Sequence, residues 1–167
     1  MIVRPEGSHD LNGIRAVHEA AFGSSLESGL VDALRDGGKL FSSMLAIEEA
    51  EVRGHVATSL VTIEFQGEAL VAGVAPLGVL PAHQRRGIGS ALMWSIITAA
   101  REAGCAGLVL LGDPAYYGRF GFEPAATFDL RSHYTDGPAF QALALDPGAW
   151  ADCRGQVRYD TSFDELD

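Results

Sequence analysis

The sequence predicts an α/β protein built on a mixed β-sheet with helices on both of its faces. Two observations lead to this class. Segments with apolar residues at helical spacing are separated by short apolar runs that indicate strands. The resulting order is β-α-α-β-β-β-α-β-α-β-β, which is typical of a mixed sheet covered by helices. The chain has no internal repeat, charge block or low-complexity linker, so residues 1–167 are predicted to form one domain.

The first part of the chain supplies a short strand and two helices. Residues 2–4 are predicted to form a short first strand, which Pro5-Glu6-Gly7 ends. Apolar residues recur at helical spacing over 10–22, and Ser8 or Asp10 is suited to cap that helix. A second short helix is predicted over 25–34, because an Asp-Gly-Gly turn follows it.

Three strands follow, separated by two turns. The runs 44–48 and 53–65 predict two strands around an acidic turn at 49–51, and 68–80 predicts a longer fourth strand. Pro76 lies inside that strand, although proline cannot donate to a sheet ladder. We therefore expect the fourth strand to be interrupted near Pro76 by a bulge and to splay apart from the fifth, which opens a cleft.

The rest of the chain adds a helix, a buried strand and a compact turn. An apolar stripe over 88–104 predicts a helix, and the fully apolar run 108–111 predicts a buried strand. A turn rich in Tyr, Gly and Phe is expected at 116–122. Extended segments are predicted near 128–130 and 140–145. Periodicity is lost after Asp146, so residues 146–167 are interpreted as a C-terminal extension.

Composition and charge narrow the classes of function. Apolar residues make up 47% of the chain and charged residues 20%, which is typical of a globular protein. The formal net charge of −10 argues against a nucleic-acid partner. A phosphate site would need a local basic island, and Arg85-Arg86 is the only adjacent basic pair. The acidity favours either a cationic amine substrate or simply solubility.

Cysteine spacing and hydropathy exclude further classes. Cys105 and Cys153 are far apart and belong to no metal-ligand spacing, so neither a metal site nor a disulfide framework is expected. The weakly polar run 69–82 is broken by glycines and prolines and is too short to span a bilayer. Because no segment has the pattern of a signal peptide, we predict a cytoplasmic protein without a membrane partner, either monomer or homodimer.

The stretch 79–92 limits the possible classes of function more than any other part of the sequence. It passes from an apolar, strand-like run through a basic loop into a helical pattern. Free backbone N–H groups at a helix start, together with the helix dipole, form a ready anion site. Gly87 and Gly89 leave those donors unobstructed, so a diphosphate could lie directly on the backbone. Arg85 and Arg86 add positive charge at the same place.

Two common nucleotide-binding patterns fit this stretch less well. A P-loop needs a Gly-Lys-Ser/Thr run that the sequence lacks, and the dinucleotide fingerprint needs a third glycine where Leu92 stands. An ordinary β–α connection with solvated arginines is the structural alternative. The pattern Val79-x-Pro81-x-x-Gln84-x-x-Gly87-x-Gly89 instead resembles the acetyl-coenzyme-A loop of the Gcn5-related N-acetyltransferase (GNAT) superfamily.

A second motif carries the same resemblance. Residues 112–122 read Gly-Asp-Pro-Ala-Tyr-Tyr-Gly-Arg-Phe-Gly-Phe and follow the short apolar strand. They resemble the acetyltransferase motif in which a polar residue follows the strand and a tyrosine stands four residues before a Gly-Phe pair. Tyr117 holds that position, and Asp113 replaces the more frequent asparagine. This form is similar to that of a bacterial branch of predicted N-acetyltransferases, and the resemblance covers roughly 1–145.

The resemblance implies the acyl-CoA N-acyltransferase fold, with acetyl-CoA as co-substrate and no metal. It implies direct attack on the thioester by a primary amine, belonging to a small molecule or to a protein. The alternative is a non-catalytic, CoA-binding regulatory module. Cofactor contacts are implied for Leu77, Val79, Gln84, Arg85, Arg86, Gly87, Ile88, Gly89, Ser90, Asp113, Tyr117 and Phe120.

The chemistry of acetyl transfer assigns roles to two residues. The reaction needs a neutral amine, a donor for the developing oxyanion and a proton for the leaving thiolate. A phenol suits the last role, so Tyr117 is predicted to be catalytic and Tyr116 to be a packing neighbour. The Val79 N–H is the predicted oxyanion donor, because a splayed strand leaves it without a sheet partner.

The general base is left open between several groups and solvent. The strand region 69–80 contains no acid. The substitutes considered are His55, Glu64, Glu123 and Tyr134. His83 lies in the basic loop and is expected to flank the phosphates instead.

Overall fold

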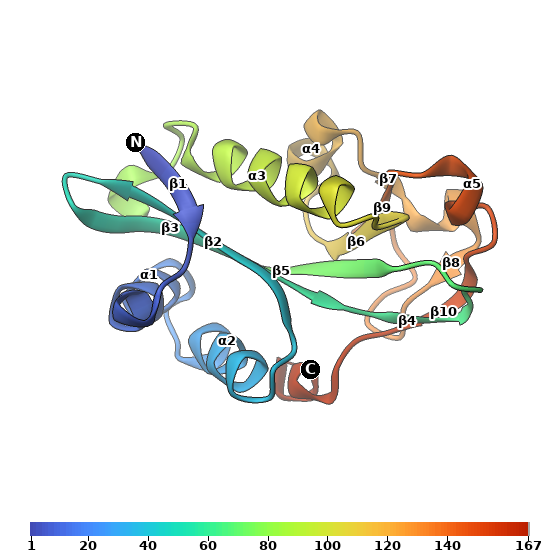
Figure 1. Cartoon of the computed structure of the whole chain (residues 1–167), viewed down its shortest axis with the longest axis horizontal. Coiled ribbons are helices and arrows are strands. Elements are labelled where there is room, and N and C mark those ends of the chain that lie inside the picture. Colours follow the sequence, from blue (N-terminus) through green and yellow to red (C-terminus); the bar gives the residue numbers. More distant parts are fainter. Residues whose placement is uncertain (167) are drawn as a thin grey trace.

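A seven-stranded sheet forms the centre of the molecule. The computed structural model describes residues 1–166. The strand order is β1-β2-β3-β5-β6-β9-β7, and β5 and β6 are its parallel pair while the other neighbours run antiparallel. Helices α1 and α2 cover one face of this sheet, and α3 covers the other (Figure 1). The predicted mixed sheet with helices on both faces is therefore confirmed.

The elements follow the predicted order with a few additions. The strands of the large sheet are β1 Ile2–Pro5, β2 Leu40–Glu48, β3 Glu51–Leu60, β5 Val71–Val79, β6 Gly107–Leu111, β7 Glu123–Pro124 and β9 Phe140–Ala144. The helices are α1 Leu11–Phe22, α2 Leu26–Asp36, α3 Ile88–Glu102, α4 Pro114–Tyr117 and α5 Pro147–Trp150. A second sheet of three strands has the order β4-β10-β8, built from β4 Thr62–Phe65, β8 Leu130–Arg131 and β10 Arg154–Arg158.

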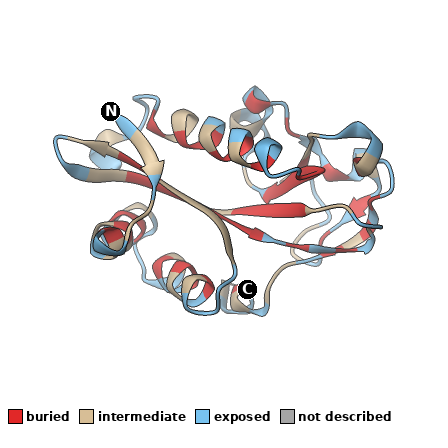
Figure 2. Cartoon of the chain, in the orientation of Figure 1, coloured by how far each residue is buried: buried red, intermediate tan, exposed pale blue. Residues whose placement is uncertain are grey.

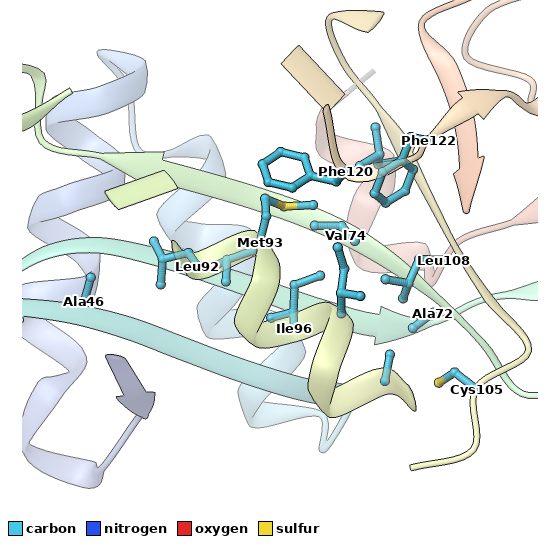
Figure 3. Packing of buried hydrophobic residues seen from close by; sticks show 14 of the residues in the cluster. Ala46, Ala72, Val74, Leu92, Met93, Ile96, Cys105, Leu108, Phe120 and Phe122 are labelled. Carbon is cyan, nitrogen blue, oxygen red and sulfur yellow. The ribbon is translucent and has the colours of Figure 1, made fainter. Parts of the chain in front are cut away.

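Helix α3 packs across the large sheet and builds the main core. Its buried positions recur at helical spacing from Ile88 through Leu92 and Ile96, so one apolar stripe faces the strands. Met93 lies between this stripe and the aromatic rings of Phe120 and Phe122 (Figure 3). Burial of this kind stabilises the fold by about 25 cal/mol for each Å² of apolar surface removed from water. The core thereby holds the start of α3 and the 112–122 motif in fixed relation.

The cleft predicted between the fourth and fifth strands is present between β5 and β6. These strands pair only from Val71–Gly107 to Gly73–Val109, and no pairing of β5 with β6 follows Gly73 in the described chain. On its other side β5 stays paired with β3, but Ala75 and Pro76 together oppose one residue of β3. The bulge expected at Pro76 is therefore confirmed, and β5 diverges from β6 immediately before it.

Two predicted strands differ from the structure. The run 53–65 is not one strand, because the chain leaves the large sheet after Leu60 and continues as β4 in the small sheet. The segment predicted as extended at 128–130 begins instead with a 3₁₀ helix over Ala125–Phe128, and a strand starts only at Leu130. Asp129 separates the two with a φ of 58°. Short segments of this kind carry too few residues for a period to appear.

The C-terminal extension is ordered into structure that packs on both sheets. It contains α5, β10 and a 3₁₀ helix over Thr161–Leu166. Trp150, Val157 and Phe163 are buried. The 3₁₀ helix over Thr161–Leu166 lies beside α2 (Figure 1), and buried residues occur in both sheets (Figure 2). A carbon atom added at Gly107 would lie 2.4 Å from the Trp150 ring, so α5 presses directly on β6. Tertiary contacts, rather than local periodicity, order this segment.

The start of α1 differs in detail from the expected cap. Asp10 is the residue at the N-cap position, yet its carboxylate makes no capping hydrogen bond to α1. It accepts hydrogen bonds from Arg4 Nη1 at 2.8 Å and from the Gly7 N–H at 2.6 Å. The Arg4 guanidinium, followed by the Gly7 hydrogen bond, holds the pKa of this carboxyl at about 2. The predicted capping role belongs neither to Asp10 nor to Ser8, because α1 has no side-chain cap.

Candidate functional site

The divergence of β5 from β6 leaves part of its backbone facing open space. The Leu80 N–H donates to the Arg53 carbonyl oxygen at 2.9 Å, so Leu80 faces β3. Backbone N–H and C=O groups alternate in direction along a strand. The backbone N–H groups of Val79 and Leu77 therefore point away from β3 and toward the cleft. The Val79 carbonyl accepts a hydrogen bond from Gln84 Nε2 at 3.1 Å. The cleft thus offers backbone N–H groups that no neighbouring strand uses.

The loop before α3 has the conformation that an anion site requires. Arg85 and Gly87 both have positive φ, 63° and 87°, which turns successive N–H groups toward the same side. The Ala91 N–H donates to the Gly87 carbonyl at 3.0 Å, so the N–H groups before Ala91 lie in the unpaired first turn of α3. Arg85 and Arg86 are exposed and make no ion pair or hydrogen bond within residues 1–166.

A cavity of about 690 Å³ extends from this loop to the 112–122 motif. Its walls come from the end of β5, the start of α3 and the region of α4. They consist of Val79, Gln84, Arg85, Gly87, Gly89, Ser90, Asp113, Ala115, Tyr116 and Arg119. This size lies within the range of about 300–1,000 Å³ that ligand pockets occupy.

Arg119 is a member of this site that the sequence reasoning missed. Its guanidinium carbon lies 4.4 Å from the centre of the Tyr116 ring, and its Nη2 donates to Ser90 Oγ at 3.3 Å. The arginine is thus aimed at the start of α3 and adds a second cation to the cavity beside Arg85. Its position three residues after Tyr116 within the motif was the available signal.

Close packing at Gly89 shapes the same cavity. A Cβ atom at this position would lie 2.5 Å from the Tyr116 hydroxyl oxygen. Tyr116 therefore lies against the first turn of α3, where it lines the cavity and also packs against the main core, as a packing neighbour would. Asp113 has a different local task, because its carboxylate accepts the Ala115 N–H at 2.9 Å and caps α4.

Tyr117 faces a second cavity of about 310 Å³ on the other side of the motif. Its lining is mostly apolar and aromatic. It consists of Phe22, Glu27, Val74, Ala75, Pro76, Leu77, Leu111, Tyr117, Tyr134, Tyr159, Phe163 and Leu166. The Tyr117 ring packs on Gly112, where a Cβ atom would overlap it. Burial, followed by the neighbouring Tyr116, raises the pKa of Tyr117 to about 12, so its hydroxyl stays protonated at neutral pH.

The structure brings most of the predicted cofactor residues to one of the two cavities. Val79, Gln84, Arg85, Gly87, Gly89, Ser90 and Asp113 line the larger cavity. Leu77 and Tyr117 line the smaller one. The other three predicted contacts, Arg86, Ile88 and Phe120, line neither. The side chains of Ile88 and Phe120 are buried in the core and cannot contact a ligand in the cavity. Ile88 can contribute only through its backbone N–H at the start of α3.

The groups considered as general base are scattered. Tyr134 lines the smaller cavity. Glu64 lies in the small sheet, where it accepts a hydrogen bond from the Gln156 N–H at 3.2 Å, and Glu123 is exposed on β7. His83 lies in a 3₁₀ turn before the basic loop. The structure adds Glu27, which lines the smaller cavity from α2 and which no sequence pattern indicated.

His55 belongs to a buried polar chain instead of the cleft. Its Nδ1 lies 2.7 Å from His18 Nε2, and its Nε2 lies 2.7 Å from Ser43 Oγ. Both imidazoles are fully buried. Burial lowers the pKa of His18 to about 4, and burial with the neighbouring His18 and Arg35 lowers that of His55 to about 2. Both rings are therefore neutral at physiological pH and serve packing between α1, β2 and β3.

The described residues contain neither a metal-binding cluster nor a helix that could span a membrane. Within residues 1–166, no group of three or more His, Cys, Asp or Glu side chains is arranged to hold a metal ion. Among the same residues, no helix combines the length and the apolar character that a membrane span requires.

Comparison with known proteins identifies the family. Residues 3–125 match the model of the acetyltransferase (GNAT) domain. The chain is 38% identical to the N-acetyltransferase YhbS of Escherichia coli over 99% of its own length and 100% of that protein. It is also 38% identical to the E. coli N-acetyltransferase YjhQ, over 70% of this chain and 66% of that protein.

Solved structures agree with this family. The E. coli YhbS structure in complex with CoA superposes with a TM-score of 0.92, at 36% identity over 99% of this chain and 93% of that one. A GNAT acetyltransferase from Brucella melitensis in complex with acetyl-CoA has a TM-score of 0.79, at 39% identity and 97% coverage of both chains. The chain belongs to the GNAT acetyltransferase family and has the acyl-CoA N-acyltransferase fold. The predicted class of enzyme, an N-acetyltransferase, is confirmed.

Proposed function

We propose that this N-acetyltransferase holds acetyl-CoA in the cleft between β5 and β6, with the diphosphate on the backbone of residues 85–90. The observation that carries the proposal is the placement of two cavities on either side of the 112–122 motif. Free N–H groups, Arg85 and Arg119 gather at one end, and Tyr117 lies at the other. The relatives solved with CoA and acetyl-CoA support the choice of ligand. We also assign residues 112–122 to the motif of a bacterial branch of this family.

The cavity between the loop and the motif fits the charged end of such a donor. The N–H groups at the start of α3 and the side chains of Arg85 and Arg119 supply positive potential that complements a diphosphate. Neither arginine is paired with a carboxylate in the described chain. The chain itself has a formal charge of −10, so this basic island is the part that attracts the anionic donor. Asp113 is occupied by its own cap, and we assign it no contact with the diphosphate.

The cleft-facing backbone of β5 supplies the next element of catalysis. The donor brings an acetyl thioester, and transfer forms a C–N bond to the acceptor as the C–S bond breaks. The Val79 N–H points into the cleft and donates to the oxygen that gains negative charge as the amine adds. Because β6 has diverged, this donor is not consumed by a sheet hydrogen bond. The proton released from the attacking nitrogen passes to water.

Tyr117 is assigned to the leaving thiolate. Its hydroxyl remains protonated because burial raises its pKa to about 12, and it makes no hydrogen bond within residues 1–166. It is therefore free to donate to sulfur as the C–S bond breaks. The acceptor is a primary amine, which enters through the smaller cavity on the side of Tyr117 that faces away from Tyr116.

Free-thiol release with a panel of amines, checked by product mass, tests this function. Tyr117→Phe should lower kcat by roughly 100-fold or more while CoA affinity stays nearly unchanged. Tyr116→Phe is the matched change on the other face of the motif, and it should raise the KM for acetyl-CoA while sparing kcat. Reversed effects of the two variants would move the catalytic role to Tyr116. CoA binding without any product would instead favour a regulatory module.

A further inference from the structure

The smaller cavity carries information about the acceptor amine. Five of its twelve lining residues are aromatic, namely Phe22, Tyr117, Tyr134, Tyr159 and Phe163. The Tyr159 ring lies 5.8 Å from that of Tyr134 and 5.0 Å from that of Phe163, so three of them form a continuous wall. Aromatic walls of this kind favour a flat, apolar ligand through edge-to-face and stacked contacts.

Among residues 1–166, one charged residue lines this cavity, and it is an acid. Glu27 is half-buried in the first turn of α2 and forms no ion pair within residues 1–166. Its contact there is a long hydrogen bond, 3.4 Å, from the Ser24 hydroxyl. The N-terminus of α2 favours a charged carboxylate at this place. An unpaired carboxylate in an apolar pocket complements a cationic group of a ligand.

The C-terminal segment closes the cavity and ties the aromatic wall to the cleft. Tyr159 packs on Gly73, where a Cβ atom would lie 2.6 Å from its ring, and Gly73 is the last residue of β5 that pairs with β6. Phe163 is buried against Leu30 and Leu34 of α2. The wall is therefore built where the strands separate, in the cavity that Tyr117 also lines.

We infer that the acceptor is an arylalkylamine, with its aromatic ring against Tyr159 and Phe163 and its ammonium group drawn in by Glu27. The ammonium group loses one proton to water before its neutral nitrogen attacks the thioester. The inference rests on the proposed function, because it names the substrate of that site. A polyamine would bring further ammonium groups into a cavity to which the described residues contribute one carboxylate. Each unpaired charge would be costly to desolvate. An aminoglycoside would lose hydrogen bonds to water along a mostly apolar wall, in a cavity of only about 310 Å³.

Selectivity among amines tests the inference. The panel contains 2-phenylethylamine, tryptamine, spermidine, kanamycin and Nα-acetyl-lysine methylamide, each assayed with acetyl-CoA. We expect kcat/KM for the two arylalkylamines to exceed that for the other three by about tenfold or more, since one buried aromatic ring contributes that much binding. Higher kcat/KM for spermidine, kanamycin or the lysine mimic would overturn the inference and leave the proposed function intact.

Two variants test the role of Glu27 directly. Glu27→Gln should raise the KM for 2-phenylethylamine about tenfold and leave the KM for acetyl-CoA unchanged, because a charge-assisted contact is lost. Asp36→Asn removes the same charge from the exposed end of α2 and should change neither constant. Leu166→Glu adds a second carboxylate to the wall and should shift preference toward spermidine. An unchanged amine KM in Glu27→Gln would contradict the assignment.

Binding separates failure of the inference from failure of catalysis. Titration calorimetry of 2-phenylethylamine into the CoA-bound protein should show binding that weakens in Glu27→Gln. If this pattern appears without any turnover, the acceptor class stands and the proposed catalysis fails. If CoA binds and arylalkylamines do not, the acceptor class is wrong.

Discussion

As the pH falls, this protein should lose stability at a higher pH than its carboxylates alone would cause. The reason is the His18–His55 pair, which lies beneath β5. Both rings are buried and neutral, and a Cβ atom at Gly78 of β5 would lie 2.7 Å from His18 Nδ1. In the unfolded chain each histidine binds a proton near pH 6.5. In the native state the pKa of His18 is about 4 and that of His55 about 2. The unfolded state therefore binds more protons below about pH 6.5.

The sign and the size of the effect follow from these pKa values. A depressed native pKa gives stability that is fully present above the unfolded pKa of about 6.5 and is lost as the pH falls toward the native value. Each pH unit in this window costs about 1.4 kcal/mol for each histidine that stays neutral. At about pH 5 the free energy of unfolding should be lower by about 2 kcal/mol for His18 and by a similar amount for His55.

Urea denaturation followed by tryptophan fluorescence at about pH 7 and about pH 5 measures this loss. The His18→Gln variant should show a fall in stability that is smaller by about 2 kcal/mol. If His18→Gln does not fold, NMR titration of the wild-type imidazoles provides the answer. Equal stability at both pH values, or imidazoles that titrate near 6.5, would refute the reasoning.

Three further predictions concern the cleft. Gly89→Val should weaken CoA binding at least tenfold, as measured by calorimetry. The new side chain would meet the Tyr116 hydroxyl, 2.5 Å from its Cβ, and would cover the backbone N–H donors. A folded variant with unchanged affinity would contradict the proposed diphosphate site. Arg119→Gln should lower CoA affinity more at low ionic strength than at high, since the lost contribution is a screened charge; equal losses at both would exclude an electrostatic role. Gly73→Ala should displace Tyr159, lower stability by roughly 1–3 kcal/mol and raise the amine KM, all measurable in one preparation; an unshifted Tyr159 ring in its crystal structure would be the contrary result.

The conformation of the loop before α3 was predictable from sequence because it is local. Gln84 to Ser90 are consecutive, and a glycine-containing turn before a helix leaves its N–H groups free whatever surrounds it. The interruption of β5 was predictable for a similar reason. Pro76 lacks the N–H that a continuous ladder needs, and the structure shows the bulge at that residue.

The bounds of the small sheet were not predictable in the same way. The run 53–65 has one uninterrupted strand-like pattern, yet the chain changes sheet at Val61, whose side chain is buried with Ala125 and Val157 in a separate cluster. Nothing in the alternation of residues marks that exchange, because both sheets demand the same period. The partner strand β10 lies in the segment after Asp146, where the sequence shows no periodicity.

The sequence by itself determined the fold class, the family and the loop proposed to hold a diphosphate, since each depends on neighbouring residues and their local conformation. Only the tertiary structure revealed the proposed acceptor pocket. The residues that line it come from opposite ends of the chain, and they include Phe22, Glu27, Tyr134, Tyr159 and Phe163. None of these five belongs to a motif. They meet because the C-terminal segment packs on α2 and on Gly73 of β5. Contacts between residues so distant in sequence leave no local pattern, so long-range packing alone defines the shape and lining of this cavity.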